Sequence, residues 1–251
     1  MLSGFQNASR VPELRRRVIF ALGMLAVYRL GVHVPTPGID RAAMAAFFDQ
    51  QKNTLFGFLN LFSGGALEQF SVFSLGIMPY ISASIILQLL TVVFPYLERL
   101  SKEGEVGRRK ITQYTRYGTV LLSIVQGTMI AIGLEGTQGP GGTPLVLNPG
   151  VAFRLMTVVT LTSGTAFIMW LGEQITERGI GNGMSLIIFA GIVARLPSAI
   201  WSTFEFMRNG ELGPLVALVI LVLSVAIIAA IIFVERGQRR IPVQYAKRVV
   251  G

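Results

Sequence analysis

The sequence contains no cysteine and a single histidine, His33. Without cysteine the chain forms neither a disulfide nor a thiolate metal site, and one isolated histidine offers neither a zinc site nor a Ser-His-Asp triad. Charge is also scarce, because Asp, Glu, Lys and Arg make up 14% of the 251 residues, against about 25% in an ordinary soluble domain. These shortages exclude a soluble enzyme, a disordered tail and a disulfide scaffold, and we expect neither a metal nor another cofactor.

Apolar residues dominate instead, at 52% of the chain, with a mean hydropathy of +0.60. Several runs approach or exceed the roughly twenty residues that cross a bilayer core as a helix. We therefore predict an all-α membrane protein, a multi-span bundle with six transmembrane helices at 18–34, 75–94, 117–134, 155–172, 184–204 and 212–234. Arg29 and Arg195 lie near the ends of the first and fifth spans, where they are expected to reach the interface. Pro79 is expected to kink the second.

Basic residues are divided unevenly among the segments that flank these spans. Sixteen Lys or Arg lie in the N-terminal segment, the second and fourth connections and the C-terminal tail, and five are assigned to the opposite side, four in its connections and Arg195 in the fifth span. Because cytoplasmic loops retain an excess of basic residues, both termini are expected in the cytoplasm. This partition explains most of the net charge of +9 without nucleic acid as the main partner, although contact of the basic loops with ribosomal RNA remains open.

Residues 55–67 are apolar but too short to span a membrane. Three glycines, Asn60 and Ser63 make this segment a weak helix with polar groups that lipid would not satisfy. Two interpretations remain open: an interfacial helix on the outer surface, or a re-entrant piece inside a pore.

A second segment, 75–90, places Ile77, Ile81, Ser84 and Gln88 along one helical stripe. This stripe is typical of helix packing with serine as a hydrogen-bonding partner, and it also suits the lining of a cavity.

Glycines are dense in a third segment, residues 173–185, at Gly179, Gly181 and Gly183. No strand precedes them and no Lys-Ser/Thr pair follows, so a nucleotide-binding loop is improbable, and a tight positive-φ turn between two helices explains them more simply.

Several stretches carry a resemblance to a known family: 37–40 (PGID), 60–67 (NLFSGGAL), 75–86 (LGIMPYISASII), 102–111 (KEGEVGRRKI), 113–118 (QYTRYG), 170–183 (WLGEQITERGIGNG) and 234–241 (VERGQRRI). In this order they resemble the bacterial SecY family, the channel subunits of the Sec protein translocase. That family has ten spanning helices in two inverted halves. The resemblance implies that residues 1–212 form the N-terminal half, with five helices and a plug at about 55–67. Residues 213–251 are expected to hold the sixth helix and the start of the cytoplasmic loop before the seventh.

The resemblance also implies roles for individual residues. The implied pore ring is Ile77, Ile81, Met184 and Ile188, with Met184 standing where the family commonly has Ile. The implied plug contains Phe58, Leu59, Asn60, Leu61, Phe62, Ser63, Gly64 and Gly65. The implied lateral gate contains Ser82, Ser84, Ile85, Gln88 and Gln126. Docking of a motor or ribosome is implied for Arg236, Arg239, Arg240, Lys247 and Arg248, and more weakly for Arg108 and Arg109.

The function implied is a protein-conducting channel of the bacterial inner membrane, which translocates unfolded preproteins and inserts membrane proteins without being an enzyme. The implied partners are the SecE and SecG subunits, the SecA motor or the ribosome, signal peptides, unfolded polypeptide and membrane lipid. One alternative is half of a small-solute secondary transporter with 179–183 as an unwound substrate site. The lack of a mid-span acidic residue weighs against it. A membrane scaffold with basic loops is the other alternative.

Overall fold

The computed structural model describes residues 11–51, 54, 57, 60 and 63–238, and over these residues it is helical, with isolated β-bridges and no strand. The chain divides into two compact units, Met1–Leu196 and Pro197–Gly251. The first unit holds α2 (Pro12–Val32), α3 (Arg41–Gln51), α5 (Met78–Val93), α6 (Pro95–Lys102), α7 (Glu105–Glu135), the 3-10 helix η1 (Pro140–Gly142), α8 (Val151–Arg178) and α9 (Gly183–Val193). The all-α fold class is confirmed.

Four segments among the described residues are long and apolar enough to cross a membrane: Glu105–Glu135, Val151–Arg178, Gly183–Arg208 and Pro214–Glu235. The bent pair α5 and α6 makes a fifth if it counts as one span. These five cover the second to sixth predicted spans. The first prediction corresponds to α2, which has 21 residues but includes Glu13 and four arginines, so its crossing of the membrane stays a prediction.

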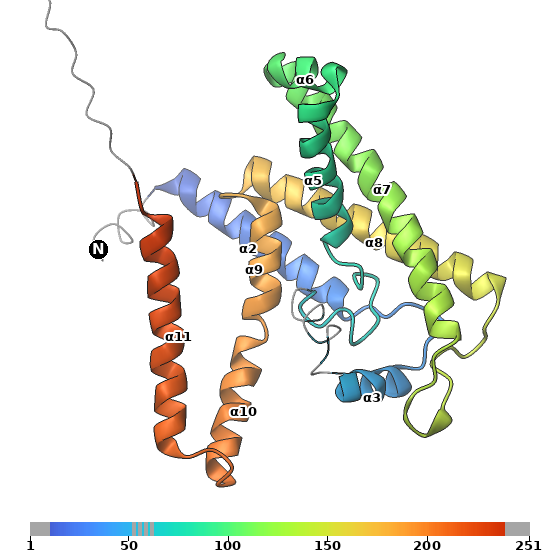
Figure 1. Cartoon of the computed structure of the whole chain (residues 1–251), viewed down its shortest axis with the longest axis vertical. Coiled ribbons are helices and arrows are strands. Elements are labelled where there is room, and N and C mark those ends of the chain that lie inside the picture. Colours follow the sequence, from blue (N-terminus) through green and yellow to red (C-terminus); the bar gives the residue numbers. More distant parts are fainter. Residues whose placement is uncertain (1–10, 52–53, 55–56, 58–59, 61–62, 239–251) are drawn as a thin grey trace, which may run out of the picture. The chain divides into compact units, whose positions relative to one another are not determined.

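Helix α8 is the centre of the first unit and packs against α2, α5, α7 and α9. Its buried face includes Leu161, Ile168, Leu171 and Ile175, each at most 1% exposed. The largest buried cluster joins Ile168, Leu171 and Ile175 to side chains of α2, α9 and the segment that leads into α5. Helix α8 is therefore the element against which α2, α5, α7 and α9 all pack (Figure 1).

Helix α5 begins later than the sequence predicts. The span was expected from Leu75 with a kink at Pro79, but residues 75–77 form a turn and Pro79 lies in the first turn of α5. Proline is tolerated there because the first N–H groups of a helix have no intrahelical acceptor. Pro79 starts the helix, so the predicted kink is wrong.

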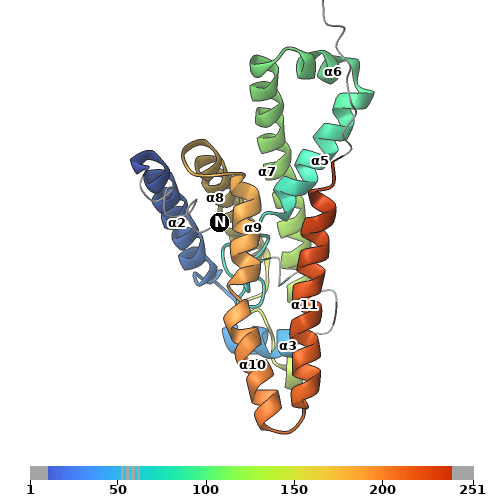
Figure 2. The ribbon, with the colours of Figure 1, turned by 90° about the vertical axis from the view of Figure 1, so that its left-hand side faces the viewer.

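Helices α5 and α6 are bent by 100° at Phe94. Phe94 has an extended conformation, φ −94° and ψ 116°, because the ring of Pro95 disfavours the helical conformation of the residue before it. Helix α6 therefore bridges the ends of α5 and α7, which pack side by side (Figure 2).

The second unit contains α10 (Leu196–Arg208), which begins at the unit boundary, and α11 (Pro214–Glu235). The turn between them includes Gly210, whose φ is +76°. None of the residues in either helix is buried. A helix that is apolar on all sides and uncovered by protein is suited to contact with lipid, as the prediction of a sixth span requires.

Candidate functional site: an apolar cavity beside a glycine-rich segment

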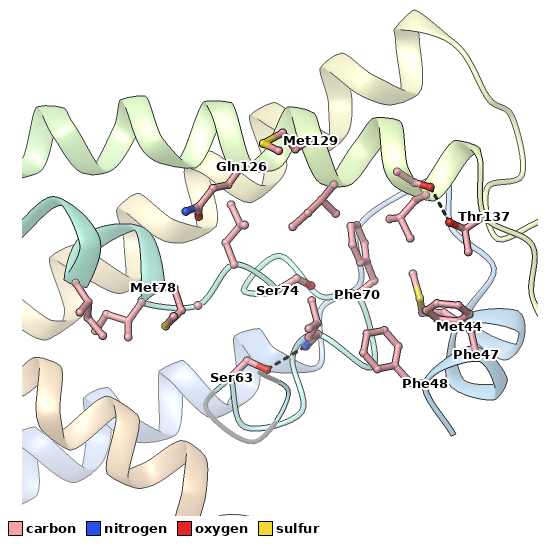
Figure 3. Close-up of a pocket in the computed structure, with 18 of the residues that line it drawn as sticks. Met44, Phe47, Phe48, Ser63, Phe70, Ser74, Met78, Gln126, Met129 and Thr137 are labelled. Carbon is pink, nitrogen blue, oxygen red and sulfur yellow. Dashed lines mark hydrogen bonds between the residues drawn. The ribbon is translucent and has the colours of Figure 1, made fainter. Parts of the chain in front are cut away.

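A cavity of about 560 Å³ lies in the first unit between α3, α5, α7 and the segment that precedes α5. Its lining is almost entirely apolar, with Met44, Phe47 and Phe48 from α3 on one side (Figure 3). Gln126 and Met129 reach it from α7, as Figure 3 also shows. The few polar side chains around it offer no cluster of titratable groups, so the cavity suits an apolar or weakly bound occupant.

Three of the four residues expected in a pore ring line this cavity. Ile77 and Ile81 reach it from the start of α5, and Ile188 reaches it from α9. Ile77 is buried and is the N-cap of α5, so Ile81 follows it by one helical turn. Met184 is placed differently, because its sulfur lies against Gly172 of α8, at 2.3 Å from where a Cβ would stand. The structure thus brings together the three isoleucines and leaves Met184 outside the cavity lining.

The candidate plug segment, residues 55–67, is only partly described. Phe58, Leu59, Leu61 and Phe62 lie outside the described residues. Gly57 and Asn60 are helical, whereas residues 63–67, the last part of the predicted helix, form turns, because Gly64 and Gly65 have φ values of +65° and +92°, outside the helical region. Ser63 and Leu67 line the cavity, so this segment forms part of its wall.

Hydrogen bonds hold the described part of this segment in a compact loop. The Ser63 hydroxyl donates to the Asn60 carbonyl at 3.1 Å. The Leu67 N–H donates to the Ser63 hydroxyl at 3.3 Å, drawn as the dashed line at Ser63 in Figure 3. Tyr28 of α2 donates from its hydroxyl to the Ser63 carbonyl at 3.2 Å. Ser63 and Asn60 are therefore buried with their polar groups satisfied inside the protein.

The residues expected at a lateral gate lie on α5 and α7, which pack against each other. Ser82 and Ser84 are half-buried, Ile85 is exposed, and Gln88 donates to the Ser84 hydroxyl at 3.3 Å. Gln126 of α7 is the member of this set that lines the cavity. The predicted stripe thus continues from the cavity toward the outer surface of α5.

The glycine-rich connection between α8 and α9 is a capping turn. Asn182 is the N-cap of α9, and its side-chain oxygen accepts from the N–H groups of Met184 and Ser185. Gly181 has the expected positive φ of +65°, whereas Gly183 serves close packing, since a Cβ there would lie 2.0 Å from the Gly172 carbonyl oxygen. The backbone groups of this turn are used by the helix, which does not favour the transporter alternative.

The docking candidates are described only in part. Arg239, Arg240, Lys247 and Arg248 lie outside the described residues. Arg236 is the C-cap of α11 and is exposed. Arg108 and Arg109 are exposed in the first turns of α7, where Arg109 pairs with Glu105 at 3.1 Å.

Charged residues near the candidate plug segment were not anticipated as site residues. Arg29 of α2 donates to the Gly64 carbonyl at 2.9 Å, and Arg195, just after α9, pairs with Glu68 at 2.6 Å. Both arginines were expected to reach the membrane interface, but their guanidinium groups contact Gly64 of this segment and Glu68 directly after it. The sequence feature that indicates these contacts is an arginine inside an otherwise apolar run, because a charge at that position favours a protein partner.

The fold and the cavity together define a multi-span helical membrane protein with an apolar internal space. A family profile described as SecY matches residues 71–251. The chain therefore belongs to the SecY family.

Similar curated proteins are named protein translocase subunit SecY. The protein of Escherichia coli (strain K12) is 58% identical over 248 residues, which cover 98% of this chain and 56% of that protein. The protein of Vibrio cholerae serotype O1 is 56% identical over 248 residues, covering 98% of this chain and 55% of that protein. The chain thus spans little more than half the length of these relatives.

Solved structures share the fold. The Sec61 chain of a canine ribosome–channel complex from the endoplasmic reticulum matches with a TM-score of 0.62 at 15% identity, covering 91% of this chain and 49% of the other. A structure described as a protein conducting channel matches with a TM-score of 0.59 at 15% identity, covering 85% and 47%. At these identities the similarity concerns the fold.

Proposed function

We propose that this chain forms part of a protein-conducting channel, which moves unfolded preproteins across a bacterial inner membrane and inserts membrane proteins into it. The observation that carries this proposal is the convergence of Ile77, Ile81 and Ile188 on one apolar cavity beside the glycine-rich segment. Membership of a family whose members are named translocase subunits supports it. The N-terminus would lie in the cytoplasm, and residues 1–212 and 213–251 would be its two functional parts.

The chemistry of the cavity suits passage of a polypeptide while ions are retained. An apolar constriction offers no group that compensates an ion for its lost hydration, so it blocks ions by dewetting. Branched apolar side chains contact a passing chain without fixed hydrogen bonds, so they do not bind it tightly. The candidate plug segment would close this constriction at rest, and the helices α5 and α7 would form one side of a lateral exit toward lipid.

Partners follow from the same proposal. SecE and SecG would complete the channel, and the SecA motor or the ribosome would dock on the basic loops at Arg108, Arg109 and Arg236 and on the following basic tail. A signal peptide, itself an apolar helix, would enter the lateral exit because moving its apolar surface out of water is favourable by about 25 cal/mol per Å². Energy for transport would come from the docked partner.

The pore ring is tested by changing Ile188 to Gly in the assembled channel. Removing the side chain widens the apolar constriction and admits water, so the resting ion conductance in planar bilayers is expected to rise roughly several-fold. The matched control is Ile192→Gly, one turn further along α9, where the side chain is exposed and does not line the cavity. Equal conductance of Ile188→Gly and the unaltered protein would refute the pore-ring assignment.

A further inference from the structure

One ion pair in the first unit joins parts of the chain that are far apart in the sequence. Arg195 donates from Nη2 to Oε2 of Glu68 at 2.6 Å, across 127 residues. The side chains are 31% and 28% exposed, so each charge of the pair has lost much of its water. By contrast, Arg17–Glu13 and Arg109–Glu105 join neighbouring turns of a single helix and are well exposed.

Glu68 also contacts Asn60 of the candidate plug segment. Asn60 donates from Nδ2 to Oε2 of Glu68 at 2.9 Å, and the Glu68 N–H donates to Oδ1 of Asn60 at 3.1 Å. A single carboxylate oxygen therefore accepts from both Asn60 and Arg195. Residues 63–68 form a loop, and this arrangement joins the loop and Asn60 to the end of α9 through one charged group.

Two glycines let the arginines approach this loop. The φ values of Gly64 and Gly65 are +65° and +92°, and a Cβ on Gly65 would lie 3.0 Å from Nη2 of Arg195. A Cβ on Gly64 would lie 3.0 Å from Nη1 of Arg29, which donates to the Gly64 carbonyl. The loop is therefore held between an arginine of α2 and an arginine that follows α9.

The position of Arg195 links this contact to the cavity. Arg195 lies two helical turns beyond Ile188 along the α9 segment, and Ile188 lines the cavity. Ser63 and Leu67, on the loop of residues 63–68, line the same cavity. Movement of the loop away from α9 would therefore break the ion pair and change the cavity wall together.

We propose that the Glu68–Arg195 ion pair is a latch that holds the loop of residues 63–68 closed against the end of α9, and that its rupture is a step in channel opening. This inference rests on the proposed function, in which residues 55–67 are the plug. A pair that is about 30% exposed on each side is attractive yet breakable, because water can replace the partner of each group when the loop moves. Arg29 contacts the loop through the uncharged Gly64 carbonyl, whereas Arg195 pairs with the carboxylate of Glu68.

The test measures opening of the loop by thiol labelling. Because the chain has no cysteine, Ser63→Cys supplies a single thiol on this chain at a buried position that labels only when the loop opens. The rate of maleimide labelling is followed with the assembled translocase in lipid nanodiscs, where both membrane faces are accessible. Glu68→Gln and Arg195→Gln, each in this background, are expected to raise the labelling rate about fivefold by removing one charge of the pair.

Two further variants separate a latch from a general loss of structure. The exchange Glu68→Arg with Arg195→Glu restores an ion pair and is expected to bring the labelling rate back toward that of the Ser63→Cys parent. Glu13→Gln breaks the exposed Arg17–Glu13 pair of α2 and is expected to change nothing. The latch is overturned if the single variants label at the parent rate, or if the exchange labels as fast as the single variants.

Ion conductance of the same variants then separates the latch from the proposed function. Faster labelling with raised resting conductance supports both. Faster labelling with unchanged conductance supports the latch but contradicts the role of residues 55–67 as a plug. Parent-like labelling with raised conductance overturns the latch and leaves the channel function standing.

Discussion

Single atoms decide how closely the segment before α5 approaches α8. A Cβ on Gly164 would lie 1.9 Å from the backbone carbonyl oxygen of Val72, so only glycine fits between them. This contact places Phe73 between two aromatic neighbours, with ring centroids 5.8 Å from Tyr28 and 6.0 Å from Phe167. The stack joins α2 and α8 through a segment that is not helical, which holds the wall of the cavity in place.

Gly164→Ala is expected to lower the free energy of unfolding by about 1–3 kcal/mol, because the added methyl group meets backbone that cannot rotate away. Unfolding of the purified protein in a denaturing detergent titration, followed by circular dichroism, measures the change. The matched control is Gly133→Ala in α7, where nothing lies within 4 Å of the added atom. The control should be as stable as the unaltered protein or up to about 1 kcal/mol more stable. Equal effects of the two substitutions would contradict the packing argument.

At the scale of elements, prolines set where the helices of the first unit begin and turn. Pro12, Pro79 and Pro95 all lie in the first turn of a helix, where the missing N–H is not needed. Pro95 has the larger consequence, since α6 leaves α5 at 100° and returns the chain to α7. Without this bend the basic start of α7 would lie farther from the end of α5.

Pro95→Ala is expected to let α5 continue into α6 as a straighter helix. Spin labels at Ile86→Cys and Ser101→Cys, both introduced into the cysteine-free chain, report the separation by pulsed electron resonance. The distance should increase toward the roughly 22 Å of fifteen residues in a continuous helix. Pro12→Ala, at the start of α2, is the control and should leave the distance unchanged. An unchanged distance in Pro95→Ala would show that packing against α7, and not the proline, holds the bend.

For the molecule as a whole, the partition of basic residues carries the proposed orientation and docking. Sixteen of the 22 Lys and Arg lie in the segments predicted to be cytoplasmic. Basic residues are therefore concentrated in these loops and nearly absent from the membrane segments. A partner that docks on the loops would meet a surface of one sign, which accelerates association at low salt.

Arg239→Glu with Arg240→Glu is expected to weaken binding of SecA or of the ribosome to the assembled channel roughly tenfold at physiological salt, and less at high salt. Pull-down of the detergent-solubilised complex over a range of partner concentrations gives the affinity. Arg208→Glu removes a basic residue from the opposite predicted side and should leave binding unchanged. The docking assignment fails if the double variant binds as tightly as this control.

Much of the fold could be read from the sequence because the bilayer imposes a simple length rule on apolar runs. The apolar stretches at 117–134 and 155–172 lie within α7 and α8, and the stretch at 212–234 begins two residues before α11. The boundaries failed where local stereochemistry competes with hydrophobicity, as at Pro79, which starts a helix that the apolar run places earlier. Helix α3 was not predicted, because its alanine-rich sequence carries no long apolar run.

Composition and hydrophobic pattern alone determined that this is an all-helical, multi-span membrane protein, and the quoted motifs determined its family. Only the tertiary structure decided that Ile77, Ile81 and Ile188 share one cavity, that Met184 packs instead on Gly172, and that Arg195 pairs with Glu68. The physical reason is the separation along the sequence over which each effect acts. Hydrophobicity acts on every residue of a run independently, whereas a close approach or an ion pair depends on two side chains that the folded backbone brings together.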